Sequence, residues 1–229
     1  APILDAGVAP DGTPWFAMGL VEGVDIVRWC REQAPGLDAC VDRFIEVCDA
    51  VAHAHRHLVV HRDIKPSNVL VDGAGRVVLL DFGIARLLED GGSEATGSAT
   101  LAFTPRFAAP EQVAGQAVTT ATDVFGLGCL LHLMLLDCAP QYPGDDTRRE
   151  CIDPVVLARR AGSRPLVRAL RGDLGAVLRK SLAADPSRRH PGAAELAADL
   201  RAFLVHPGID TEAKLQALDR SFPAAWSAL

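Results

Sequence analysis

Apolar residues recur at two different spacings along the chain, which separates helices from short strands. Between residues 38 and 58 they fall three or four positions apart, the period of one helix face: Val41, Phe44, Ile45, Cys48, Val51, Ala52, His55 and Leu58. The same spacing, with its start and stop signals, predicts further helices at 24–33, 122–136, 173–182 and 192–204. The stretch 137–172 is polar and interrupted by Pro and Gly, and its pattern does not locate the helices within it.

Strand-forming residues gather on both sides of a short turn after residue 68. The runs 69–71 and 77–80 consist of Val and Leu and flank Asp72-Gly73-Ala74-Gly75, a sequence typical of a tight turn. This pattern predicts a β-hairpin. Because the two strands of a hairpin run in opposite directions, Asn68 before the first strand and Asp81 after the second are expected at the same end.

Polar side chains of a particular kind surround this hairpin. His61-Arg62-Asp63-Ile64-Lys65-Pro66-Ser67-Asn68 precedes it and Asp81-Phe82-Gly83 follows it. A carboxylate such as Asp63 can accept or orient a hydroxyl proton, and Lys65 can meet a phosphate. Mg²⁺ prefers a few hard oxygen ligands, which Asn68 and Asp81 can supply. Together these groups predict a site for phosphoryl transfer.

The two segments resemble the catalytic loop and the metal-binding motif of eukaryotic-type serine/threonine protein kinases, in the form found in bacteria. Later segments agree in order and spacing: Ala109-Pro110-Glu111, then Asp123, then the run 185–189. The resemblance implies that Asp123 anchors the catalytic loop from a buried helix. It also implies a buried ion pair between Glu111 and Arg189.

The resemblance extends to a nucleotide site. Residues 15–23 are similar to the strand and hinge beside the adenine pocket, with Met18 in the gatekeeper place. It implies that Met18, Leu20, Val21, Leu70 and Asp81 contact ATP, with Mg²⁺ as the accompanying cofactor and Asn68 and Asp81 as its ligands. Lys65 in the catalytic loop implies a protein substrate with a Ser or Thr acceptor.

Parts of the family pattern have no counterpart in these 229 residues. The chain has three lysines, Lys65, Lys180 and Lys214, so no lysine precedes the catalytic loop to bind the α- and β-phosphates. We therefore expect an α+β, mainly helical fold, made up of a kinase-like C-lobe (24–205), a remnant of N-lobe strands and hinge (1–23) and a tail (206–229). Such a chain alone should have little or no activity. A non-catalytic binding or scaffolding domain is the alternative.

Charge and cysteine content narrow the range of binding partners and of cellular compartments. The chain has 23 basic and 29 acidic residues, a net charge of −6, which argues against a general nucleic-acid or membrane-surface binder. Its six cysteines show no C-x-x-C spacing and are expected to be free thiols of a reducing compartment. The N-terminal residues show no signal-peptide pattern. These features predict a cytoplasmic protein.

Overall fold

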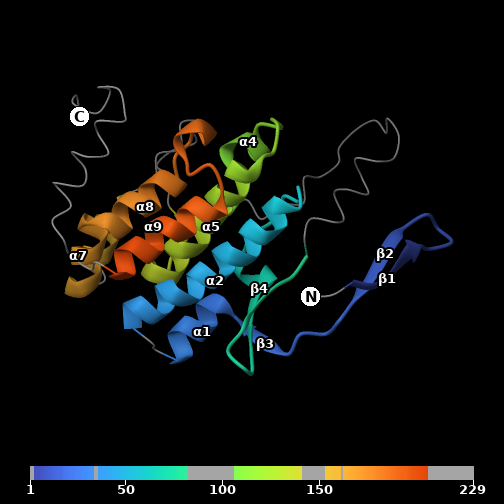
Figure 1. Cartoon of the computed structure of the whole chain (residues 1–229), viewed down its shortest axis with the longest axis horizontal. Helices are drawn as coiled ribbons and strands as arrows, with labels where there is room; N and C mark the ends of the chain where they lie inside the picture. Colours follow the sequence, from blue (N-terminus) through green and yellow to red (C-terminus); the bar gives the residue numbers. More distant parts are fainter. Residues whose placement is uncertain (1–2, 34–35, 82–105, 141–152, 161, 206–229) are drawn as a thin grey trace.

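The computed structural model describes residues 3–33, 36–81, 106–140, 153–160 and 162–205. Within them the fold is α+β and mainly helical, with two small sheets near the N-terminal end of the chain. Figure 1 shows the helices gathered in one body and the first two strands extending away from it. None of the described helices combines the length and the apolar run that crossing a bilayer requires.

The first sheet is a hairpin of β1 (Ile3–Val8) and β2 (Pro14–Met18). The strands are antiparallel, with Ala6 opposite Phe16 and Gly7 opposite Trp15. A hydrogen bond from Ala9 N–H to the Thr13 carbonyl, 2.8 Å long, closes the turn between them. Gly12 in this turn has φ +86°, the left-handed region that glycine enters without steric cost.

The second sheet has three strands, one more than the sequence predicts. The expected hairpin is confirmed as β4 (Val69–Asp72) and β5 (Val77–Leu79), and β3 (Gly23–Asp25) pairs with the free edge of β4. The predicted helix 24–33 was therefore wrong at its start, because Val24 and Asp25 lie in β3. The helix that follows, α1, spans Ile26–Gln33.

Four helices build the core. α2 (Gly36–Arg56) packs against α9 (Ala193–Val205) and α5 (Thr120–Leu136), and α8 (Asp173–Ser181) packs against α5 and α9. All four begin and end within two residues of the predicted helices. α5 is buried continuously from Thr122 to His132, as a helix that is apolar on all sides should be.

Shorter elements complete the body. The 3₁₀ turn η1 (Pro66–Asn68) lies in the predicted catalytic loop, α4 (Pro110–Val113) contains Glu111, and the 3₁₀ turn η2 (Pro186–Arg188) directly precedes Arg189. α6 (Pro154–Arg160) and α7 (Arg164–Arg171) occupy the stretch in which the sequence pattern could not locate helices. The five cysteines that the structure describes are free thiols, and Cys151 lies outside the described residues.

Candidate active site

The catalytic-loop residues predicted from sequence lie together. Lys65 Nζ lies 2.6 Å from Asp63 Oδ2, and Asn68 Nδ2 donates to Asp63 Oδ2 at 3.1 Å. The same Asn68 amide also donates to the Asp63 backbone carbonyl at 2.8 Å, which fixes its orientation. Asn68 is buried, while Asp63 and Lys65 remain partly accessible. One cation and one amide therefore hold an accessible carboxylate in place.

The hairpin places Asp81 beside this loop, as predicted. Leu80 N–H donates to the Asn68 carbonyl at 2.9 Å, so the residue before Asp81 is bonded to Asn68 itself. Asp81 is exposed and has φ +47°, an uncommon value for a residue other than glycine. Such a conformation persists only where its surroundings hold it. Here the carbonyl of Leu80 is bonded to the ring of His61, with Nε2 at 2.9 Å.

Asp123 in α5 anchors the loop, as the sequence resemblance implied. Its two carboxylate oxygens accept the backbone N–H groups of His61 at 2.7 Å and of Arg62 at 2.8 Å. Arg62 has φ +68°, so the loop turns sharply at the residue before Asp63. A third bond comes from His55 Nε2 in α2, 2.9 Å from Asp123. Sequence reasoning missed this contact, although the place of His55 on the apolar face of the helix was a signal for it.

His61 is buried inside this network. Burial lowers the pKa of its imidazole, and the nearby carboxylate of Asp123 opposes that shift only in part. The ring is therefore neutral at physiological pH. A neutral imidazole fits its position, in which one ring nitrogen meets a backbone carbonyl.

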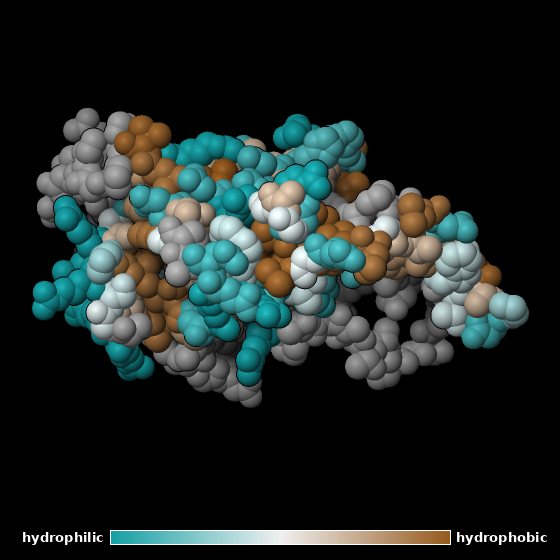
Figure 2. All heavy atoms as spheres, turned by 90° about the horizontal axis from the view of Figure 1, so that it is seen from below, coloured by the Kyte–Doolittle hydropathy of each residue, from teal (hydrophilic) through white to brown (hydrophobic). Residues whose placement is uncertain are grey.

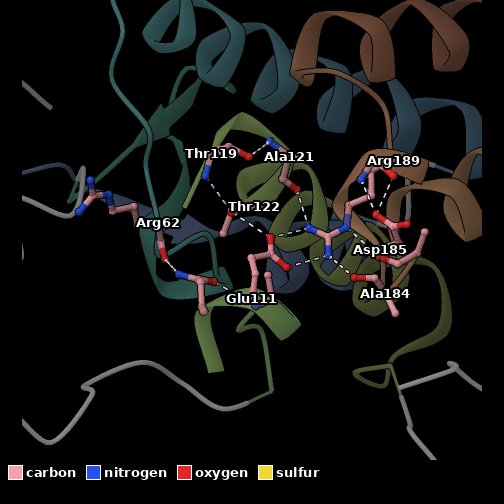
Figure 3. Close-up of polar contacts among 12 residues, drawn as sticks. Arg62, Glu111, Thr119, Ala121, Thr122, Ala184, Asp185 and Arg189 are labelled. Carbon is pink, nitrogen blue, oxygen red and sulfur yellow. Dashed lines mark hydrogen bonds and ion pairs between the residues drawn. The ribbon is translucent and has the colours of Figure 1, made fainter. Parts of the chain in front are cut away.

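Glu111 and Arg189 form the buried ion pair that the sequence resemblance implied (Figure 3). Arg189 Nη1 donates to Glu111 Oε1 at 2.7 Å and Nη2 donates to Oε2 at 2.8 Å, a bidentate arrangement. Thr122 also donates to Glu111, and Arg189 donates to backbone carbonyls, including that of Ala121. Burial by itself would raise the pKa of Glu111, but the bonds from Arg189 keep it below its usual value.

Gln112 joins α4 to the catalytic loop, a contact that sequence reasoning did not foresee. Its Oε1 accepts Ala109 N–H at 3.0 Å, and its Nε2 donates to the Arg62 carbonyl at 2.8 Å. One side-chain amide thus bridges two backbone segments. Its place directly after Glu111 was the only sequence signal.

Comparison with known proteins matches this arrangement to a family. Residues 9–199 match the protein kinase domain. The chain belongs to the protein kinase family. PknB of Mycolicibacterium smegmatis, a serine/threonine-protein kinase, is 35% identical over 217 residues, which are 90% of this chain and 33% of that protein. PknB of Mycobacterium tuberculosis H37Rv is 34% identical over 225 residues, 92% of this chain and 34% of that protein.

By family the chain is thus a Ser/Thr protein kinase, of a class of transferases that bind ATP. It spans about a third of the length of these relatives. Solved structures agree in fold. A double mutant of the PknI kinase domain of Mycobacterium tuberculosis superposes with a TM-score of 0.63 at 24% identity, covering 88% of this chain and 70% of that one. The apo form of PpkA-294 gives 0.60 at 24% identity, covering 86% and 66%.

The residues expected beside the nucleotide lie along two segments of this kinase fold. Met18 ends β2, and Leu20 and Val21 follow in the connection to β3. Leu70 lies in β4 opposite Asp25 of β3, and the connection before β3 enters this pairing at Gly23, opposite Asp72. Met18, Val21 and Leu70 are partly buried, whereas Leu20 is 90% exposed.

Proposed function

We propose that this kinase transfers the γ-phosphate of ATP to Ser or Thr hydroxyls of a protein substrate. The observation that carries this proposal is the pairing of Asp63 with both Lys65 and Asn68 beside Asp81. An accessible carboxylate held by a lysine and an amide, next to a second exposed carboxylate, supplies the groups that phosphoryl transfer needs at the acceptor hydroxyl and at the metal.

Asp63 is assigned the role of the base that accepts the proton of the substrate hydroxyl. Its carboxylate orients the substrate hydroxyl and takes its proton as the bond to phosphorus forms. Lys65, 2.6 Å from this carboxylate, can turn to the γ-phosphate when ATP is present and then neutralise charge there. Since both side chains are about a quarter exposed, substrate can reach them.

Asn68 and Asp81 are assigned as ligands of Mg²⁺, and their surroundings suit a hard cation. The Asn68 amide nitrogen is committed to Asp63, so its Oδ1, which accepts one long bond of 3.3 Å from Ser67, is left for a metal. The Asp81 carboxylate makes no hydrogen bond with any other residue in the described ranges. Bound with ATP, Mg²⁺ would neutralise the phosphate oxygens.

The adenine side of the site is assigned to the connection between the sheets. Met18, Leu20, Val21 and Leu70 supply apolar side chains there, and the hinge backbone supplies polar groups. On this assignment residues 1–23 correspond to the N-lobe strands and hinge, and 24–205 to the C-lobe. The tail 206–229 lies outside the described residues.

We further infer that these 229 residues turn over slowly when assayed by themselves. Each of the three lysines lies at or after the catalytic loop, so no upstream lysine is available to the α- and β-phosphates. Loss of one preorganised donor costs roughly 10²–10³ in rate.

A single-turnover assay tests the assignment. Purified chain, Mg²⁺ and γ-labelled ATP are incubated with a Ser/Thr peptide mixture and compared with Asp63→Asn and Asp81→Asn. We expect slow, Mg²⁺-dependent labelling that falls about 10²–10⁴-fold in Asp63→Asn. Equal labelling by wild type and Asp63→Asn would contradict the assigned role. A chain that binds protein substrate but never labels it would instead be a scaffolding domain.

A further inference from the structure

Four arginines line one hollow at the end of the molecule remote from the catalytic loop. The hollow measures about 440 Å³, lies between the end of α6 and α7, and is bordered by Arg159, Arg164, Arg168 and Arg171, with Ser163 and Val167 among them. Arg164, Arg168 and Arg171 are spaced four and three residues apart on α7, which puts them on one helix face. Their positive charges therefore converge on a common space.

These arginines differ from six others in the part of the chain that the structure describes. In the described part of the chain six arginines pair with a carboxylate: Arg28, Arg31, Arg43, Arg76, Arg189 and Arg201. No side chain of the four arginines around the hollow makes a hydrogen bond or ion pair with another described residue. In a chain with net charge −6, carboxylates are not scarce. Within the described ranges, therefore, no ion pair compensates the positive charge of the hollow.

The arrangement is unfavourable for the free protein. Like charges three and four residues apart on a helix repel one another. Arg164 also stands in the first turn of α7, where the helix dipole disfavours a cation. A bound anion would relieve both effects, since it would meet several guanidinium groups at once.

A second hollow adjoins the first and is apolar. It measures about 390 Å³ and shares Ser163 with the arginine-lined one. Its lining includes Leu37, Met134, Leu135, Pro165 and Leu166 from three different parts of the chain. Figure 2 shows hydrophilic side chains projecting at the end of the molecule where α7 lies, beside a strip of hydrophobic surface. A small inorganic anion would use only the first hollow.

We propose that the two hollows form a docking site for an acidic segment of a partner protein, in which carboxylate or phosphoryl groups meet the arginines and neighbouring apolar side chains enter the second hollow. Charge complementarity with the arginines favours an acidic ligand. The adjoining apolar hollow favours a polypeptide, which carries apolar side chains, over a free anion. This site is separate from Asp63 and goes beyond the phosphoryl transfer proposed above. Binding at it does not require that reaction.

Fluorescence anisotropy tests the docking site with the complete 229-residue chain. The probe is a labelled peptide of glutamates followed by leucines, and a second peptide carries phosphoserines in place of the glutamates. We expect saturable binding that weakens about tenfold or more in Arg164→Glu/Arg168→Glu. Tighter binding of the phosphoserine peptide would assign a phosphoryl-bearing partner, and tighter binding of the glutamate peptide a carboxylate-bearing one.

The matched control is Arg160→Glu/Arg179→Glu, which changes net charge equally at two exposed arginines that line neither hollow. It should bind the peptides within about twofold of wild type. Circular dichroism checks folding, and Arg164→Gln/Arg168→Gln replaces the charge reversal if that variant does not fold. Equal loss in both double variants would overturn the docking site. So would tighter binding of single-stranded DNA than of either peptide.

Discussion

Arg189 grips Glu111 with two parallel hydrogen bonds of 2.7 and 2.8 Å, and neither side chain is more than 4% exposed. The guanidinium group also lies over the ring of Phe125, 4.9 Å from its centre. This pair connects α4, next to the catalytic loop, to the segment between α8 and α9. Loss of this ion pair should therefore destabilise both of the segments that it connects.

Arg189→Met should destabilise the fold strongly. Removing one partner of a buried pair leaves an uncompensated charge, at a cost of about 3–5 kcal/mol. Urea unfolding measures the change. The control is Arg201→Met, whose pair with Asp49 is half exposed on both sides and should be worth less than about 1 kcal/mol. Similar losses in the two variants would show that burial of the Glu111 pair has no special weight.

Gln112→Ala should loosen the catalytic loop without unfolding the protein. The change leaves the Arg62 carbonyl and the buried Ala109 N–H without the side chain that bridges them. We expect a loss of about 1–3 kcal/mol in the free energy of unfolding. Gln116→Ala, an exposed position in the loop after α4, is the control and should stay within about 0.5 kcal/mol of wild type.

The free energy of unfolding should fall as pH drops below about 6.5, the usual pKa of histidine. Burial lowers the pKa of both His61 and His132 in the folded chain. In this window the unfolded chain binds protons that the folded chain does not, so acid favours unfolding. Urea midpoints between pH 7.5 and 5.5 measure the slope. His132→Leu should flatten it, and an unchanged slope in that variant would contradict the assignment for His132.

Gly175→Ala should be among the most damaging small substitutions. A Cβ atom at this position of α8 would lie 1.8 Å from the carbonyl oxygen of Leu170, so the turn between α7 and α8 must open. Overpacking of this kind costs about 1–3 kcal/mol or more. Gly73→Ala is the control, because nothing lies within 4 Å of its added atom. Thermal unfolding of the two variants should differ by several degrees.

The sequence was informative where local signals and tertiary roles coincide. The hairpin, the long helices and the pairing of Glu111 with Arg189 were all expected, because periodicity and turn residues specify the first two and a family motif the third. The contact between Asp123 and the loop was expected on the same ground. Each rests on residues whose type leaves few alternatives.

The wrong and missing predictions concern positions where long-range contacts determine the secondary structure or the partner of a side chain. Val24 fits a helical period as well as a strand, and only pairing with β4 makes it part of β3. α6 and α7 are seven and eight residues long and flanked by Pro and Gly, so periodicity had too little length to detect them. The contacts of His55 and Gln112 depend on which backbone groups the folded chain brings near, and residue type alone does not show that.

The carboxylate of Asp123 has a further consequence for how the molecule opens. It accepts the amides of His61 and Arg62 from α5, the described helix with the most buried residues, so these two amides are protected from solvent while the contact with α5 persists. Their hydrogen exchange should then be as slow as that of the α5 backbone itself. The loop next to Asp63 and the helical core would thus form one cooperative unit and unfold together.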